Sequence, residues 1–293
     1  TRHISPTVKP GDDFYTYVNE GWLKSTPIPK GGWERGAFGD LGEETRARVA
    51  SLIREASGGL VGHLYASYRN RERIEKLGLA PIQKDLKGIL ASRTHRDIAR
   101  YMADPRANAL VAINVFPDAG NTRRSLVYLD QLERNNRVLG LPGREHYERK
   151  DGAFPGHRAA YVVYIASTLK RAGIEDGERR AADILALETK LAACQWSLEQ
   201  LRDRKANYHL MTRKQLAVYA SGFPWDTFLA ARKVGHVQEV VLGTDSAVQA
   251  QAKIFGETPV AVWASYLAFH WIQNQVAFLP KAFEAASFDF YGR

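Results

Sequence analysis

The segment from Thr258 to Leu279 constrains the fold most, because it is apolar around much of its circumference when drawn as a helix. Thr258 followed by Pro259 is typical of a helix cap and first helical position. The apolar character then continues through Trp263, Phe269 and Val276. Such a helix must be buried on more than one side. The segment therefore predicts a core made of several packed helices.

The remaining periodicity is also mostly helical. A second stripe has apolar residues at alternating spacings of three and four, with a charged face between them. Its members are Ile184, Leu187, Leu191, Cys194, Leu198 and Leu201. Helical patterns also run from about Asp40 to a stop at Gly58 and Gly59, and then through 60–77 and 82–90.

Two short apolar runs interrupt the helical pattern, Leu110–Phe116 and Leu126–Leu129. The residues between them, 118–121, are Asp, Ala, Gly and Asn, which favour a turn. We therefore predict a small β-hairpin. The predicted fold class is mainly α, with several helices and this one hairpin.

The first 33 residues differ from the rest, because proline and glycine recur through them. One short aromatic helix is predicted between these residues, with Asp12 or Asp13 as its cap and Tyr17 and Trp22 on its apolar face. We interpret residues 1–33 as an extended leader and residues 34–293 as the helical domain. The first residue is Thr1, so we expect an upstream segment to have been removed.

The net charge of +9 is compatible with an acidic or nucleic-acid partner. The basic clusters, such as 69–73 and 202–205, are interleaved with acidic residues, which is typical of solvated helix faces. This distribution argues against nucleic-acid binding. No run approaches the roughly 18 apolar residues of a membrane span.

The sequence contains no recognisable catalytic motif. Its eight histidines include no pair at i and i+4, so the H-E-x-x-H motif of zinc hydrolases is absent. Phosphate-binding glycine loops and a G-x-S-x-G elbow are also absent. We expect His270 to be a hydrogen-bonded core or interface histidine, and Cys194 to be a small buried hydrophobe. His146 and His157 flank a loop where either could meet a carboxylate.

Four stretches, in order along the chain, resemble landmarks of the neprilysin and endothelin-converting enzyme family of zinc metallopeptidases. They are P-G-D-D-F-Y at 10–15 with V-N-E-G-W-L at 18–23 and I-P at 28–29, L-G-L-P-G-R-E-H-Y at 139–147, A-L-E-T-K-L-A at 186–192 followed by R-D at 202–203 and N-Y at 207–208, and K-A-F at 281–283 with F-D-F-Y-G at 288–292. The resemblance covers nearly the whole chain.

The resemblance implies that this chain is the non-catalytic, N-terminal helical lid of such an enzyme. Zinc would be bound by a separate or cleaved catalytic segment and not by this chain, and the substrate would be a peptide. The leader, 1–33, would pack on the catalytic segment, and we expect the apolar 258–279 helix to help build the same interface. The family location implied is periplasmic or secreted, although a cytoplasmic one stays open.

The resemblance also implies a substrate-binding arginine shortly after the I-P pair. An ungapped alignment places Glu34 at that position, with Arg35 next to it and Trp33 before it. We name Arg35, Glu34 and Trp33 as candidate substrate-binding residues, because a shift of one residue restores the arginine. A glutamate there would remove the carboxylate clamp. A stand-alone peptide-binding or scaffold module without catalysis is the alternative function.

Overall fold

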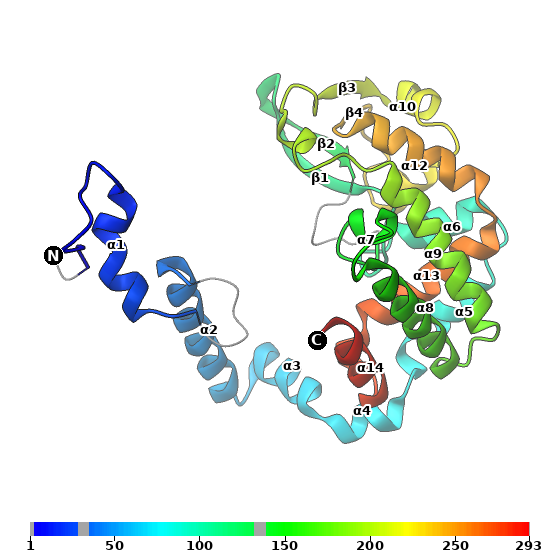
Figure 1. Ribbon diagram of the computed structural model, residues 1–293. Coiled ribbons are helices and arrows are strands. Elements are labelled where there is room, and N and C mark those ends of the chain that lie inside the picture. The colour runs from blue at the N-terminus through cyan, green and yellow to red at the C-terminus, as the bar shows by residue number, and fades with distance from the viewer. Residues whose placement is uncertain (1–2, 29–34, 132–138, 293) are drawn as a thin grey trace. The chain divides into compact units, whose positions relative to one another are not determined.

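A computed structural model describes residues 3–28, 35–131 and 139–292 of the chain. The chain divides after Asn70 into two units, 1–70 and 71–293, which we call unit 1 and unit 2 (Figure 1). Within the described ranges, no helix combines the length and apolar character needed to cross a membrane.

The described residues of unit 1 form three helices. They are α1 (Phe14–Ser25), α2 (Ala37–Glu55) and α3 (Gly59–Arg69). Asp13 caps α1, because its Oδ1 accepts a hydrogen bond of 2.9 Å from the Thr16 backbone amide, which confirms one of the two predicted caps. None of these helices buries a hydrophobic side chain.

Unit 2 is a helical body with one small sheet. Its helices are α4 (Arg71–Leu77), α5 (Ala80–Leu90), α6 (His95–Met102), α7 (Glu145–Glu148), α8 (Phe154–Arg171), α9 (Gly177–Ala193), α10 (Arg213–Tyr219), α11 (Trp225–Ala231), α12 (Asp245–Glu257), α13 (Val260–Asn274) and α14 (Lys281–Tyr291). Two 3₁₀ turns accompany them, η1 (Gln200–Arg202) and η2 (Val276–Phe278).

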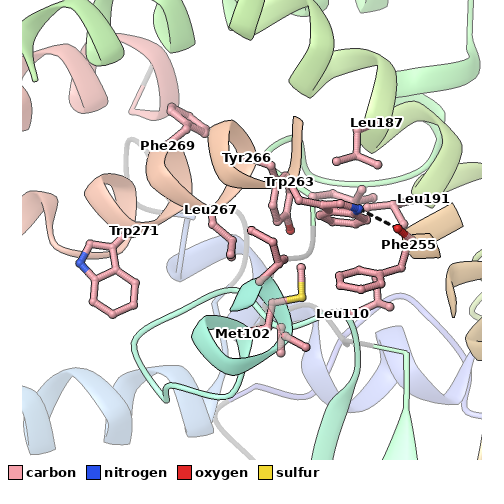
Figure 2. Close-up of a cluster of buried hydrophobic side chains, with 14 of the residues drawn as sticks. Met102, Leu110, Leu187, Leu191, Phe255, Trp263, Tyr266, Leu267, Phe269 and Trp271 are labelled. Atoms are coloured by element: carbon pink, nitrogen blue, oxygen red, sulfur yellow. Dashed lines mark hydrogen bonds between the residues drawn. The ribbon is translucent and has the colours of Figure 1, made fainter. Parts of the chain in front are cut away.

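The core of unit 2 forms around α13, whose residues 263–272 are all buried. This helix packs against α5, α6, α8 and α9. Figure 2 shows Trp263 of α13 near Leu187 and Leu191 of α9, with its indole donating a hydrogen bond of 3.1 Å to the Phe255 carbonyl, and Phe269 of the same helix at the other side of the cluster. The prediction that this segment is buried on several sides is confirmed.

Two boundaries in these helices differ from those predicted. The helix around Trp263 begins one residue later, with Pro259 as its N-cap, and it ends at Asn274 instead of continuing to Leu279. Residues 263–272 lie in the core of unit 2, so this part of the segment is not available to the interface that we expected the 258–279 segment to help build. Phe278, near the end of the same segment, is exposed.

The helix predicted from the apolar stripe at 184–201 is also shorter in the structure. Helix α9 ends at Ala193, so Leu198 lies outside it and is exposed. The chain is diverted there because both amide atoms of the Gln131 side chain bond the backbone of Trp196, its Oε1 accepting from the amide at 2.7 Å.

The predicted hairpin is present, as β1 (Ala112–Asp118) and β2 (Asn121–Asp130). The structure adds two strands that were not predicted, β3 (His209–Thr212) and β4 (Glu239–Leu242). The strand order is β1-β2-β4-β3, with β2 and β4 parallel and the other pairs antiparallel. Figure 1 shows this sheet at one end of unit 2, near α10 and α12.

Candidate functional site

The first candidate site is the start of α2, where the sequence placed substrate contacts. Trp33 and Glu34 lie outside the described residues, so only Arg35 of the three candidates can be located. Arg35 is exposed, and its Nε lies 3.3 Å from the Asp40 carboxylate in the first turn of α2. Since a guanidinium has five N–H donors, this pair leaves others to bind a second carboxylate.

A large apolar side chain follows this arginine three residues later in the sequence. Phe38 is also in the first turn of α2, and it is 92% exposed. Sequence reasoning did not single it out, and no motif in the sequence marks it. The start of α2 therefore presents a positive group and an apolar group, which is the chemistry that binds a peptide terminus and a side chain.

The second candidate site is a cavity of about 430 Å³ within unit 2, beside the end of α13. Its walls are mostly polar and come from the residues Pro105, Arg106, Ala107, Asn108, Leu139, Gly140, His270, Gln273, Asn274, Gln275 and Tyr291. Several of these groups are already hydrogen-bonded, because the Asn274 amide donates to the Arg106 carbonyl at 3.0 Å and to Asn108 Oδ1 at 2.8 Å.

A buried carboxylate lies next to this cavity. Glu188 of α9 is fully buried and accepts hydrogen bonds from several elements. Its Oε1 lies 2.7 Å from His270 Nε2 and accepts from the Tyr161 hydroxyl at 3.1 Å. Its Oε2 accepts from the Tyr147 hydroxyl at 2.7 Å and from the Gly140 amide at 3.3 Å. The prediction of a hydrogen-bonded core histidine at 270 is thus confirmed.

The arrangement around Glu188 orders the loop 139–147. Gly140 has no room for a side chain, because a Cβ atom there would clash with the Tyr161 hydroxyl. Burial raises the pKa of Tyr147 and Tyr161 well above the usual value, and the nearby Glu188 charge adds to the effect. Both phenols therefore stay protonated and donate to the carboxylate. Because Glu188 is fully buried and its bonds go to groups of the protein, we interpret this centre as one that positions the loop.

The other candidate groups also have structural surroundings. The His146 and His157 rings stack with centroids 5.7 Å apart, and His146 Nδ1 lies 3.4 Å from the Glu145 carboxylate. Partial burial raises the pKa of the Cys194 thiol to about 11, and its Sγ donates to the Leu191 carbonyl. A thiol with such a pKa is not a nucleophile at neutral pH.

Zinc sites in proteins need three or four nitrogen, sulfur or carboxylate ligands that converge on one point. Across residues 3–28, 35–131 and 139–292, no group of three or more histidine, cysteine, aspartate or glutamate side chains is placed to hold a metal ion. His270 and Glu188 are already engaged with each other in the core. The described part of the chain therefore does not fit a zinc ion.

Residues 10–293 match the model for the N-terminal part of peptidase family M13. The chain belongs to peptidase family M13. It is 25% identical to endothelin-converting enzyme 1 of Cavia porcellus over 98% of this chain and 40% of that protein. The human protein of that name is 24% identical, over 98% of this chain and 39% of that protein. The family-level resemblance predicted from the four landmarks is confirmed.

Solved structures agree with this membership. The zinc metalloprotease ZMP1 of Mycobacterium tuberculosis, in complex with an inhibitor, superimposes with a TM-score of 0.83 at 28% identity, over 99% of this chain and 46% of that chain. PEPO from Lactobacillus rhamnosis has a TM-score of 0.71 at 16% identity, over 97% of this chain and 46% of that chain, and shows the same fold. The chain spans about 40% of the length of the curated relatives it matches.

Proposed function

We propose that this chain is the non-catalytic lid half of a neprilysin-like zinc metalloendopeptidase. The zinc ion and the catalytic residues would belong to a further polypeptide segment. The main support is that the family model matches residues 10–293, nearly the whole chain, while the chain covers only about 40% of the length of endothelin-converting enzyme 1. The described residues also offer no zinc ligand set, although relatives such as ZMP1 are named zinc metalloproteases.

The surface of unit 1 supports an obligate partner. Its helices bury no hydrophobic side chain, yet they carry exposed Phe14, Leu41, Leu52 and Leu64. So many exposed large apolar side chains on helices without a core of their own are typical of a surface that packs on another segment. We assign residues 1–33 as a leader that packs on the catalytic segment, and residues 34–293 as the lid.

The peptide substrate would meet the start of α2. Arg35 is the candidate that binds the C-terminal carboxylate or the backbone of the peptide, with Trp33 and Glu34 beside it. Its exposure and its ion pair with Asp40, which orients the guanidinium, support this role. We infer a periplasmic or secreted location for the whole enzyme, which cell fractionation would test.

The decisive experiment is to purify the chain together with the polypeptide that follows or accompanies it. We expect one zinc ion per complex and zinc-dependent cleavage of peptides. In that complex, Arg35→Ala should raise KM about tenfold for peptides with a free C-terminal carboxylate, as expected when a charge-assisted hydrogen bond is lost. C-terminally amidated peptides should change less. Arg48→Ala, at an exposed arginine within α2, is the matched control.

The alternative function, a stand-alone peptide-binding or scaffold module, has one favourable observation. Unit 2 buries the apolar α13 within its own core, so this helix leaves no large apolar patch exposed. A monodisperse isolated chain that binds peptides, with no associated segment carrying zinc, would establish this alternative and exclude the metallopeptidase lid.

A further inference from the structure

Helix α4 is held to unit 2 in an unusual way. It follows directly on the division between the two units and buries none of its own residues. Its C-terminal end leads through Gly78, which has a left-handed φ of 55°, into α5, which is anchored by buried Ile82 and Leu86. A left-handed glycine between an unburied helix and a buried one is a natural point for the chain to bend.

Two polar contacts fasten α4 to the last helix of the chain, α14. Arg71 forms an ion pair with Glu284, and each of these two side chains is about two-fifths exposed. Glu75 Oε1 accepts a hydrogen bond of 2.7 Å from the Lys281 backbone amide. Lys281 is the first residue of α14, so Glu75 satisfies one of the amides that a helix leaves unpaired at its N-terminus.

The far end of α14 is fixed much more firmly. Phe290 stacks on Tyr164 with ring centroids 5.1 Å apart, and it also stacks on Tyr161. The Tyr291 hydroxyl donates to the Gly140 carbonyl at 3.1 Å, while the Gly140 amide donates to Glu188. α14 is therefore part of the body of unit 2, whereas the ion pair between Arg71 and Glu284 lies on the surface, where such pairs contribute little stability.

We propose that α4 and α14 form a releasable clip within unit 2. With the clip closed, α4 is held to the body of unit 2 through α14. With the clip open, α4 separates from α14 and turns about Gly78. Only the expected effect on the complete enzyme rests on the proposed function, since the clip itself lies within this chain.

Hydrogen exchange of the α4 amides in the 293-residue chain tests the clip directly. Glu75→Ala should accelerate exchange in residues 71–78 about five- to tenfold, because the cap across the two helices is lost. Arg71→Glu and Glu284→Arg should each accelerate it up to about fivefold. In the double variant, Arg71→Glu with Glu284→Arg, the exchange rate of residues 71–78 should return to within about twofold of the wild-type rate. Glu72→Ala, an exposed residue of the same helix, is the matched control.

Exchange of the buried α13 amides shows whether a variant has damaged the fold as a whole, and it should not change. Unchanged exchange at 71–78 in Glu75→Ala and Arg71→Glu, or no recovery in the double variant, would overturn the clip. In the complete enzyme, open-clip variants should alter peptide KM or kcat at constant zinc content. If the wild-type complex has no peptidase activity, the proposed function fails, while the exchange data still decide the clip.

Discussion

Units 1 and 2 are made of similar helices but differ in how those helices are stabilised. Every buried hydrophobic residue among those described lies at Ile82 or beyond, so all of them belong to unit 2. Among the described residues, more than half of the large exposed hydrophobic side chains lie in unit 1, which is less than a quarter of the chain. Most helical stability in proteins comes from tertiary packing of an apolar face, which the helices of unit 1 lack. We therefore predict that unit 2 folds alone and that unit 1 is stabilised only by packing on a further surface.

The buried carboxylate gives the largest expected difference between the units. Glu188→Ala should lower the free energy of unfolding of unit 2 by roughly 3–5 kcal/mol, because the Tyr147, Tyr161, His270 and Gly140 donors lose their common acceptor. Urea unfolding followed by tryptophan fluorescence measures this loss.

Two substitutions serve as controls for Glu188→Ala, one at an exposed position of the same helix and one in an ion pair between neighbouring turns of α1. Glu178→Ala, on an exposed position of the same helix, should change stability by only about 0.5 kcal/mol. Glu20→Ala in unit 1, which removes a local pair with Lys24, should leave the global transition where it is. If Glu20→Ala destabilised the chain as much as Glu188→Ala, unit 1 would share the cooperative core and the comparison would be wrong.

A pair of leucines tests the same difference in apolar packing. Leu191→Ala in α9 should cost about 2–4 kcal/mol, because the fully buried side chain leaves a cavity. Leu52→Ala in α2 should cost less than about 0.5 kcal/mol in the isolated chain, since this leucine is 66% exposed.

The same pair behaves differently if unit 1 packs on a catalytic segment. Leu52→Ala should then weaken binding of that segment measurably by calorimetry, whereas it has little effect on the isolated chain. A large loss of stability from Leu52→Ala in the isolated chain would show that unit 1 already has its own core.

The sequence predicted the parts of the fold that depend on long periodic patterns. The α13 core and the β1–β2 hairpin could be predicted because their apolar residues repeat along one segment. Strands β3 and β4 could not, since each has four residues and exists only through pairing with strands distant in sequence.

The candidate sites divide in a similar way. Arg35 was found through resemblance to a motif, while its partner Asp40 became visible only in the structure. Glu188 was missed as a buried group because its neighbours in sequence, Thr189 and Lys190, suggest a solvated helix face. Its burial depends on Tyr147, Tyr161 and His270, which are brought to it by folding.

Acid should affect the two units through different aspartates. Asp118, at the hairpin of unit 2, accepts hydrogen bonds from Tyr208 at 2.6 Å and from Arg124 at 2.7 Å, and these lower its pKa from 3.8 to about 2. Because the folded pKa lies below the unfolded one, the stabilisation is fully present above about pH 4 and is lost as the pH falls towards 2.

This linkage predicts that Asp118→Asn lowers the melting temperature of unit 2 at pH 7 and has progressively less effect between pH 4 and 2. Thermal unfolding of the wild type and of Asp118→Asn across this pH range measures the difference between their melting temperatures. Asp13→Asn, which removes only a cap within α1, is the control from unit 1 and should leave the transition of unit 2 unchanged at each pH. If the difference in melting temperature between the wild type and Asp118→Asn did not become smaller in acid, the stabilising role assigned to the ionised Asp118 carboxylate would be wrong.

Helix caps give the smallest expected effect. Thr94 forms a capping box with Asp97 at the start of α6, a helix that buries Ile98, Ala99 and Met102 in the core of unit 2. Thr94→Ala should therefore lower global stability by about 1 kcal/mol, or about 2–4 °C in melting temperature. Asp13→Ala removes a similar cap from α1, but it should reduce only the far-ultraviolet helical signal of the isolated chain, because α1 is not coupled to a core. Equal shifts in melting temperature for the two variants would mean that a cap in unit 1 contributes to cooperative folding, which its exposed helices do not support.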